Sequence, residues 1–277
     1  MITKFLLTGD CHANFSRFKN LPKEDQNNEN LGVVILGDLG LNFTLGSGDS
    51  QLKNFLDKRY KFTIYGVRGN HEARPQDVPG MELVYDENVK GEVYLQKKWP
   101  KLRYFKDWGI YQFGDYKVAI IGGAYSVDKY YRLANGLRWF ENEQLSTEEM
   151  IQCTRDLTNQ KVDLVLTHTC PIAWEPFDLF LPSIVQSTVD KSMELFLEEL
   201  AQVFEWSVWC FGHYHADRIE RPHIEQLYTD MEDLDTLMER WYSYDENGEL
   251  EWWLVKSPNY YVEDYLNPYG IKGDYNV

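Results

Sequence analysis

The residues that could carry out chemistry lie in five short blocks rich in acid, amide or imidazole side chains. The chain contains six histidines, and only His223 falls outside these blocks. The blocks offer carboxylate, amide and imidazole groups as metal donors, but no thiolate. Such a donor set suits Mn, Fe or Zn rather than an iron–sulfur cluster or a structural zinc site. The blocks are Asp10-Cys11-His12, Gly37-Asp38, Arg68-Gly69-Asn70-His71-Glu72, Thr167-His168 and Gly212-His213-Tyr214-His215.

The number of donors indicates two metal ions rather than one. A single ion could not use all of them and still keep positions for water and substrate. Two ions that share one carboxylate, roughly 3.5–4 Å apart, fit the set better, as in two-metal hydrolytic sites. His71 is left over for another role. The seven candidate ligands are Asp10, His12, Asp38, Asn70, His168, His213 and His215.

Each block also has a structural interpretation when it is taken alone. An Asp after a strand is ordinary turn chemistry, and a single His168 can be a buried histidine whose hydrogen bonds are satisfied. The block 68–72 could be a polar turn. His213 and His215 are harder to explain in this way, because alternate residues at a strand end leave the same face. The metal-site hypothesis therefore depends on all five blocks together.

Short apolar runs precede these blocks and predict buried strands. Runs that are apolar throughout indicate a sheet covered on both faces by other elements. In α/β sheets, ligand sites gather beyond the carboxyl ends of the strands, which is where five of the six runs place Asp, Asn or His. The runs are Phe5–Thr8, Val33–Leu36, Phe62–Val67, Val118–Ile121, Val162–Leu166 and Val208–Phe211.

Helices are predicted between the strands, which favours an α/β or α+β fold. The expected helices are Asp49–Tyr60, Ser146–Leu157 with a capping box at its start, and Asp190–Phe204. Residues 84–121 are expected to form an inserted antiparallel sheet, and 242–244 with 250–255 a hairpin. Pro22–Asn30 is predicted to be a loop. A single domain over residues 1–277 is expected, with 257–277 as an irregular tail.

Composition excludes several classes of protein. The net charge is 28 − 44 = −16, and such a field repels polyanions, which argues against a nucleic-acid partner. The four cysteines form no close pair, so no disulfide framework is predicted. No apolar run approaches the roughly 18 residues of a membrane span. The apolar stretch within residues 1–7 is too short for a signal peptide, so none is expected. A cytoplasmic globular protein is expected; its oligomeric state is not predicted.

The ordered blocks resemble the calcineurin-like metallophosphoesterase superfamily, of a bacterial or phage type, over residues 9–215. The resemblance implies a four-layer sandwich of two mixed β-sheets flanked by helices, with a dinuclear centre at the carboxyl ends of the strands. It also implies roles for the site residues: Asp10, His12 and His215 hold one ion, Asn70, His168 and His213 the other, Asp38 bridges both, and His71 is the general acid.

The activity implied is metal-dependent hydrolysis of a phosphomonoester or a small phosphodiester, a phosphoric ester hydrolase reaction. A hydroxide that bridges the two ions would attack phosphorus directly. Manganese is the metal expected first, with iron or zinc as alternatives. Two other interpretations stay open: a scaffold of this fold that binds a partner protein without catalysis, and a nuclease, against which the acidic charge argues.

Substrate contacts are predicted less directly. Arg68 could clamp phosphate and take part in catalysis, or form a structural ion pair. Asn70 could touch substrate as well as metal, and Tyr125 and Arg132 could line the pocket or belong to a packed turn. Phosphoprotein phosphatases continue the second block as Gly-Asp-x-x-Asp-Arg-Gly, whereas Leu41 stands here in place of the second Asp. A conventional Ser/Thr phosphatase is therefore not expected, and no orienting partner of His71 is predicted.

Overall fold

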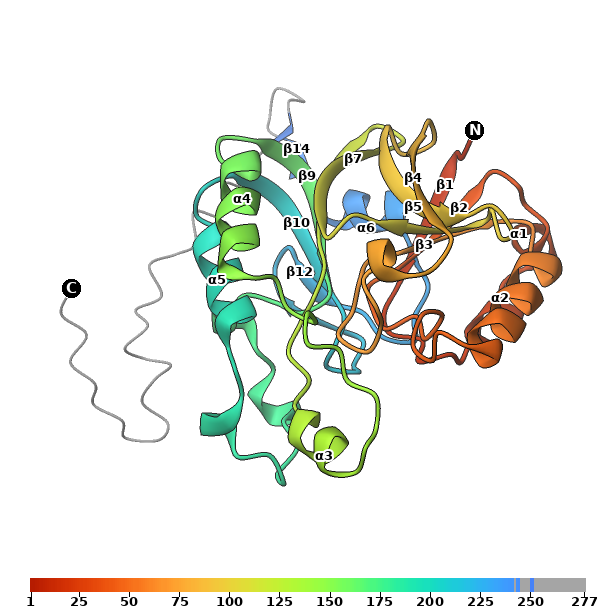
Figure 1. Ribbon diagram of the computed structural model, residues 1–277. Coiled ribbons are helices and arrows are strands. Elements are labelled where there is room, and N and C mark those ends of the chain that lie inside the picture. Colours follow the sequence, from red (N-terminus) through yellow and green to blue (C-terminus); the bar gives the residue numbers. More distant parts are fainter. Residues whose placement is uncertain (242, 245–249, 252–277) are drawn as a thin grey trace.

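Two β-sheets lie face to face, and helices cover the outer face of each sheet (Figure 1). The computed structural model describes residues 1–241, 243–244 and 250–251. The predicted tail at 257–277 lies outside the described residues. No helix in the described part of the chain is long and apolar enough to cross a membrane.

The first sheet has a parallel centre. β1 (Lys4–Thr8), β2 (Leu31–Ile35), β3 (Thr63–Gly66) and β6 (Leu102–Phe105) are parallel neighbours in that order. The antiparallel strands at its edges are β5 (Gly91–Gln96) and β4 (Met81–Asp86) on one side and β13 (Glu232–Asp233) on the other. The predicted apolar runs at the start of the chain thus form neighbouring strands.

The second sheet repeats this plan. Its parallel strands are β8 (Tyr116–Ile121), β9 (Lys161–Thr167), β10 (Glu205–Phe211) and β12 (Ile224–Gln226). Its antiparallel edges are β7 (Trp108–Phe113) and β11 (Arg218–Arg221). β14 (Ser243–Tyr244) pairs with β15 (Leu250–Glu251), as the predicted hairpin requires, while the rest of that hairpin lies outside the described residues.

Successive side chains of the central strands point to opposite faces of the sheet, and this alternation gives the fold its separate core layers. On β1, Phe5 and Leu7 enter the core between the sheets, whereas Leu6 joins a second core beneath α2. On the other sheet, Leu164 faces the central core and Val165 the core beneath α4 and α5. Because both faces of each strand are buried, the strands are apolar throughout. The predicted four-layer sandwich of two mixed sheets is confirmed.

The predicted helices form with shifted ends. The Ser146 capping box is present, because Ser146 accepts a bond from the Glu149 amide and the Glu149 carboxylate accepts one from the Ser146 amide. The loop predicted at 22–30 contains a short helix, and α3 and α6 were not predicted. The helices are α1 (Lys23–Gln26), α2 (Ser47–Arg59), α3 (Lys129–Ala134), α4 (Thr147–Leu157), α5 (Ser192–Leu200) and α6 (Leu234–Trp241).

The prediction of one inserted sheet over residues 84–121 is wrong. β4 and β5 extend the first sheet through β6, whereas β7 and β8 belong to the second sheet. The chain passes from one sheet to the other at residues 106–107. Alternating apolar residues indicate a strand but not its partner, so the division between the sheets could not be seen in the sequence.

Candidate metal centre

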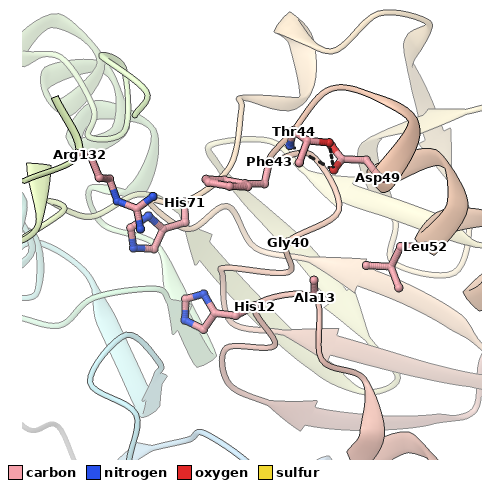
Figure 2. A pocket seen from close by; sticks show the side chains of 10 residues that line it. His12, Ala13, Gly40, Phe43, Thr44, Asp49, Leu52, His71 and Arg132 are labelled. Carbon is pink, nitrogen blue, oxygen red and sulfur yellow. Dashed lines mark hydrogen bonds between the residues drawn. The ribbon is translucent and has the colours of Figure 1, made fainter. Parts of the chain in front are cut away.

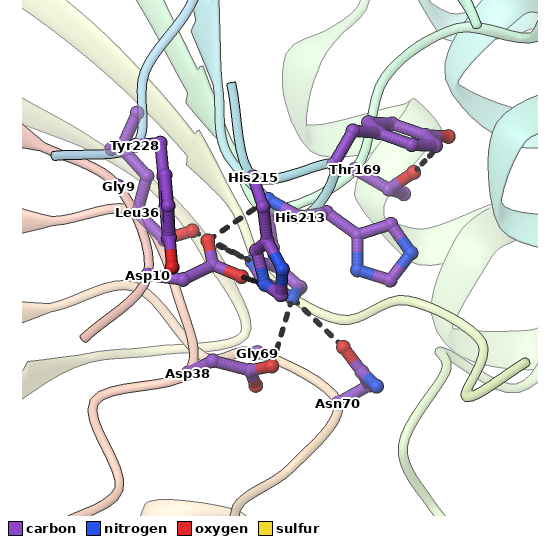
Figure 3. A network of polar contacts seen from close by, with 12 residues as sticks. Gly9, Asp10, Leu36, Asp38, Gly69, Asn70, Thr169, His213, His215 and Tyr228 are labelled. Carbon is purple, nitrogen blue, oxygen red and sulfur yellow. Dashed lines mark hydrogen bonds and ion pairs between the residues drawn. The ribbon is translucent and has the colours of Figure 1, made fainter. Parts of the chain in front are cut away.

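Three of the predicted ligands converge on the solvent side of the site. His12 Nε2 lies 2.9 Å from His215 Nε2, and His215 Nε2 lies 3.1 Å from Asp10 Oδ2. Asp10 follows β1 of the first sheet, and His215 follows β10 of the second. The carboxyl ends of strands from two different sheets therefore supply one group of donors, as Figure 3 shows for Asp10 and His215.

A second group lies deeper, around His168. His168 Nε2 is 2.9 Å from Asn70 Oδ1 and 3.7 Å from Asp38 Oδ2. His168 Nδ1 lies 2.7 Å from the carbonyl oxygen of Leu36, which fixes the ring with Nδ1 protonated and Nε2 free to bind metal. A backbone carbonyl in this position is the usual orienting partner of a metal-binding histidine.

Asp38 stands between the two groups. Its Oδ2 atom is 3.8 Å from His12 Nε2 and 3.7 Å from His168 Nε2. Asp10 also reaches both groups, since its Oδ1 lies 3.9 Å from His168 Nδ1. A carboxylate between two histidines from different groups is in the position that a shared ligand needs.

His213 is placed differently from the other candidates. Its backbone amide donates to Asp10 Oδ1 over 2.9 Å. Its ring centroid lies 4.9 Å from that of His168, but the ring is not part of either convergent group. Burial and the neighbouring His168 hold the pKa of His213 well below its usual value, so the imidazole is neutral, as a ligand must be. Its metal-binding role stays a prediction.

The backbone at the site is strained. His12, Asp38, His213 and His215 all have positive φ angles, at 43°, 47°, 69° and 56°. Non-glycine residues adopt this region at an energetic cost, and such strain clusters at functional sites. Four of the seven predicted ligands are thus held in conformations that local preference opposes.

Two glycines allow the ligands to approach one another. A Cβ atom on Gly37 would lie 2.0 Å from His168 Nδ1, and the φ of Gly37 is 101°. A Cβ atom on Gly69 would lie 2.1 Å from Asp38 Oδ1. Any other residue at these positions would displace a ligand, which gives a physical reason for the glycines that precede Asp38 and Asn70.

The electrostatics favour ionised carboxylate and neutral sulfur at this site. Burial alone would raise the pKa of Asp10, but His168, His12 and His215 outweigh it and hold that pKa well below its usual value. Cys11, between two ligands, is buried in the core, and burial raises the pKa of its thiol to about 12. Cys11 is therefore a packing residue, and the candidate donors are nitrogen and oxygen only.

These observations fit two divalent ions. Asp10, His12 and His215 would hold one ion, Asn70 and His168 with His213 the other, and Asp38 would contact both. The oriented Nε2 of His168 and the close approach of His12 and His215 are what a metal-binding site requires. An all-protein arrangement gains little from two imidazole nitrogens 2.9 Å apart, since only one of them can carry the proton between them.

A buried relay orients Asn70, and the sequence analysis missed it. Asn70 Nδ2 donates to Ser126 Oγ over 2.8 Å, and Ser126 Oγ donates in turn to Glu143. The Ser126 amide also donates to Glu143, over 3.0 Å. With its NH₂ group held in this way, Asn70 turns its oxygen toward His168. Ser126 and Glu143 lie 56 and 73 residues beyond Asn70, so no local pattern could have linked them.

Replacing Ser126 with alanine is expected to weaken metal binding by roughly 10- to 100-fold, the usual effect of losing a partner of a metal ligand. The reason is that the Asn70 amide loses its orienting acceptor. Titration of the metal-free protein with Mn²⁺ in a calorimeter measures the change. Ser207→Ala is the control, because the Ser207 hydroxyl has no hydrogen-bond partner among the described residues. Equal affinities in both variants would remove Ser126 from this role.

Arg68 forms a structural ion pair, and the prediction that it clamps substrate is corrected. Its guanidinium bonds Asp107, and its Nη1 donates to the Glu143 carbonyl over 2.5 Å. Arg74 adds a second contact to Asp107 at 3.0 Å. The Arg68 side chain is 1% exposed and does not line the pocket beside the metal site. The pair joins the chain after β3 to the point where the chain changes sheets.

Replacing Arg68 with alanine is therefore expected to lower stability rather than substrate affinity. Removing one partner of a buried ion pair costs up to about 3–5 kcal/mol when the other charge is left uncompensated, and the loss here should fall below that range because Arg74 still contacts Asp107. Denaturant unfolding measures this loss. Arg155→Ala on the exposed face of α4 should leave stability nearly unchanged. A raised KM with normal stability would instead support the hypothesis that Arg68 binds the phosphate of the substrate.

Of the three other predicted substrate contacts, Asn70 stays a prediction, and the structure places Tyr125 and Arg132 differently. Tyr125 is buried and does not line the pocket beside the metal site, so it belongs to a packed turn. Arg132 does line that pocket, together with His71 and His12 (Figure 2). Asp128 holds the Arg132 side chain through a 2.8 Å bond to Nε. The cation that faces the pocket is thus Arg132 and not Arg68.

Neighbouring groups have opposing effects on the pKa of His71. Its amide donates to Asp38 Oδ1 over 2.8 Å, which ties it to the metal centre. Burial lowers the pKa of the His71 imidazole, Asp38 opposes this, and the Arg132 guanidinium lowers the pKa further. An anionic phosphoester beside both side chains would favour the protonated imidazole that a general acid requires.

Of three comparisons with known proteins, the one with protein families places the chain in a family. The calcineurin-like phosphoesterase family matches residues 3–217. Among solved structures, the chain is similar to a phosphopantetheinyl hydrolase from Mycobacterium tuberculosis, with a TM-score of 0.37, 10% identity, and coverage of 81% of this chain and 88% of the other. A comparison with curated proteins found no match. The chain belongs to the calcineurin-like phosphoesterase family.

Proposed function

We propose that this protein hydrolyses a phosphomonoester or a small phosphodiester, using two divalent metal ions and water as the nucleophile. The observation that carries the proposal is the position of Asp38 Oδ2 between His12 and His168, at 3.8 and 3.7 Å. Two ions bound there would lower the pKa of water and offset the negative charge that develops on the phosphoryl oxygens. The ions expected are Mn²⁺ first, then Fe or Zn.

The chain's own residues have distinct tasks in this proposal. Asp10 and Asp38 would hold the ions together with four histidines, and Asn70 would present its oxygen to the site. The four histidines are His12, His168, His213 and His215. His71 gives a proton to the leaving oxygen, a step that general acids accelerate by about 10²–10⁴-fold. Arg132 contacts the phosphoryl oxygens from the pocket wall, where its planar guanidinium suits two oxygens at once.

A side-chain nucleophile is not needed. Ser126 is buried and bonded to Glu143, and Thr44, the hydroxyl among the residues lining the pocket, donates to Asp49 over 2.5 Å. Cys170 is fully buried, and burial raises the pKa of its thiol well above the usual value. Water is therefore the nucleophile that this arrangement favours.

Turnover of activated esters tests the proposal. The metal-free protein, reloaded with Mn²⁺, is expected to hydrolyse p-nitrophenyl phosphate or bis(p-nitrophenyl) phosphate, and the untreated metal-free protein is not. The ratio of the two rates decides between monoester and diester. A protein with two ions per chain that hydrolyses neither compound would contradict the proposal and favour the non-catalytic scaffold.

A further inference from the structure

A pocket of about 460 Å³ adjoins the metal centre, and nothing in the phosphoryl chemistry requires it. Figure 2 shows His71 and Arg132 at one end, Leu52 at the other, and Phe43 between them. The pocket lies between the loop that follows Asp38 and the segment that carries α3. It is therefore a place for a part of the substrate other than the reacting phosphoryl group.

The end of the pocket away from the metal centre is apolar in character. Leu52 offers its side chain there, and Phe43 lies between Leu52 and Arg132 (Figure 2). Asp49 also lines this end, but its carboxylate already accepts bonds from the amides of Thr44 and Leu45 at 3.1 and 2.8 Å. These bonds close the loop before α2 and engage both carboxylate oxygens, so Asp49 acts there through its negative charge rather than as a free hydrogen-bond acceptor.

The direction of the pocket identifies which part of the substrate enters it. His71 is the residue proposed to protonate the leaving oxygen, and it lies in the pocket wall. The leaving oxygen must come within hydrogen-bond distance of its acid. The group attached to that oxygen then extends past His71 toward Phe43, so the pocket receives the leaving group.

Charge limits the leaving group further. Among the described residues that line the pocket, Arg132 is the only permanent cation, and it lies at the phosphoryl end. A leaving group with further phosphates would meet the Asp49 carboxylate and apolar carbon, without a cation to balance it. Aromatic surfaces instead favour a flat ring, which packs on a phenyl face in stacked or edge-on geometry.

We propose that the preferred substrates are phosphate esters whose leaving group is an uncharged aromatic or heteroaromatic alcohol held against Phe43. This inference rests on the proposed phosphoesterase function and names its substrate class. The Phe43 ring packs edge-on against Phe140, with ring centroids 6.3 Å apart. The Arg132 guanidinium lies 5.8 Å from the centroid of Phe43, which joins the phosphoryl contact and the apolar wall in one pocket.

Two phosphonates test the proposal without turnover. Benzylphosphonate has the shape of phenyl phosphate, with a CH₂ group in place of the ester oxygen, and methylphosphonate lacks the ring. Calorimetric titration of the Mn²⁺-loaded protein is expected to show benzylphosphonate binding about tenfold more tightly, since the ring is buried against Phe43. Phe43→Ala should abolish this preference.

Two further variants distinguish a specific loss of ring binding from a general loss of folding. Phe43→Leu keeps an apolar side chain of similar size, and should retain the fold while losing most of the preference for the ring. Phe55→Ala removes an exposed phenylalanine of α2, and should bind both phosphonates like the unchanged protein. Equal binding of the two phosphonates by the unchanged protein would overturn the proposal, as would a preference that survives Phe43→Ala.

Hydrolysis separates this inference from the proposed function. Phenyl phosphate is expected to have a higher kcat/KM than methyl phosphate, with a Phe43→Ala effect mainly on KM. If both esters are hydrolysed but benzylphosphonate and methylphosphonate bind equally tightly, the phosphoesterase function is supported and the aromatic specificity is refuted. Failure to hydrolyse any ester would contradict the phosphoesterase function, and the inference with it.

Discussion

Replacing Asp38 with asparagine is expected to release at least one of the two metal ions and to abolish most of the activity. The carboxylate lies between His12 and His168, and the substitution removes its negative charge without changing its shape. Even the partners of metal ligands contribute about 10- to 100-fold to affinity, so a ligand shared by two ions should contribute more. Metal content after dialysis and the rate with p-nitrophenyl phosphate measure the two effects.

The fold should survive this change, which makes the result interpretable. Asp38 has a φ angle of 47°, and asparagine is among the residues that tolerate this region best. The side-chain oxygen can still accept the bond from the His71 amide. Asp115→Asn, at an exposed turn, is the matched control and should behave like the unchanged protein. Two ions per chain and full activity in Asp38→Asn would refute the bridging role.

Replacing His71 with alanine is expected to slow hydrolysis while both ions stay bound. A positioned general acid contributes about 10²–10⁴-fold, and the contribution is largest when the leaving group is a poor one. The loss should therefore be small for p-nitrophenyl phosphate and near the upper part of that range for phenyl or alkyl phosphates. A series of aryl phosphates whose phenol leaving groups have graded pKa values measures this dependence.

Metal content distinguishes this effect from simple damage to the site. His71→Ala should retain two ions, since His71 is not among the seven predicted ligands and its backbone amide can still donate to Asp38 Oδ1. His223→Asn removes an imidazole outside the site and keeps a residue that tolerates the φ of 67° found there. That control should leave the leaving-group series unchanged. If His71→Ala slows the hydrolysis of all these aryl phosphates equally, His71 is excluded as the general acid.

The ligand blocks could be found in the sequence because each directly follows an apolar strand. Asp10 comes two residues after β1, and His168 comes directly after β9. Parallel strands bring their carboxyl ends to one edge, so sequence order was enough to group the candidate metal ligands. The four-layer fold was predictable for a similar reason, since strands buried on both faces require a covering layer on each side.

The substrate side of the site could not be found in this way. Arg68 and Arg132 are both arginines near polar segments, and their roles differ because of partners distant in sequence. Asp107, which is 39 residues from Arg68, holds that side chain inside the protein. Ser126 orients Asn70 over a similar separation. Such pairings depend on how the two sheets pack, which no local pattern encodes.

Anomalous scattering from crystals of the Mn²⁺-loaded protein tests the central claim most directly. The account predicts two peaks, one contacting Asp10, His12 and His215, and the other contacting Asn70, His168 and His213. Both should contact the Asp38 carboxylate. A single peak, or two peaks of which neither touches Asp38, would contradict the account.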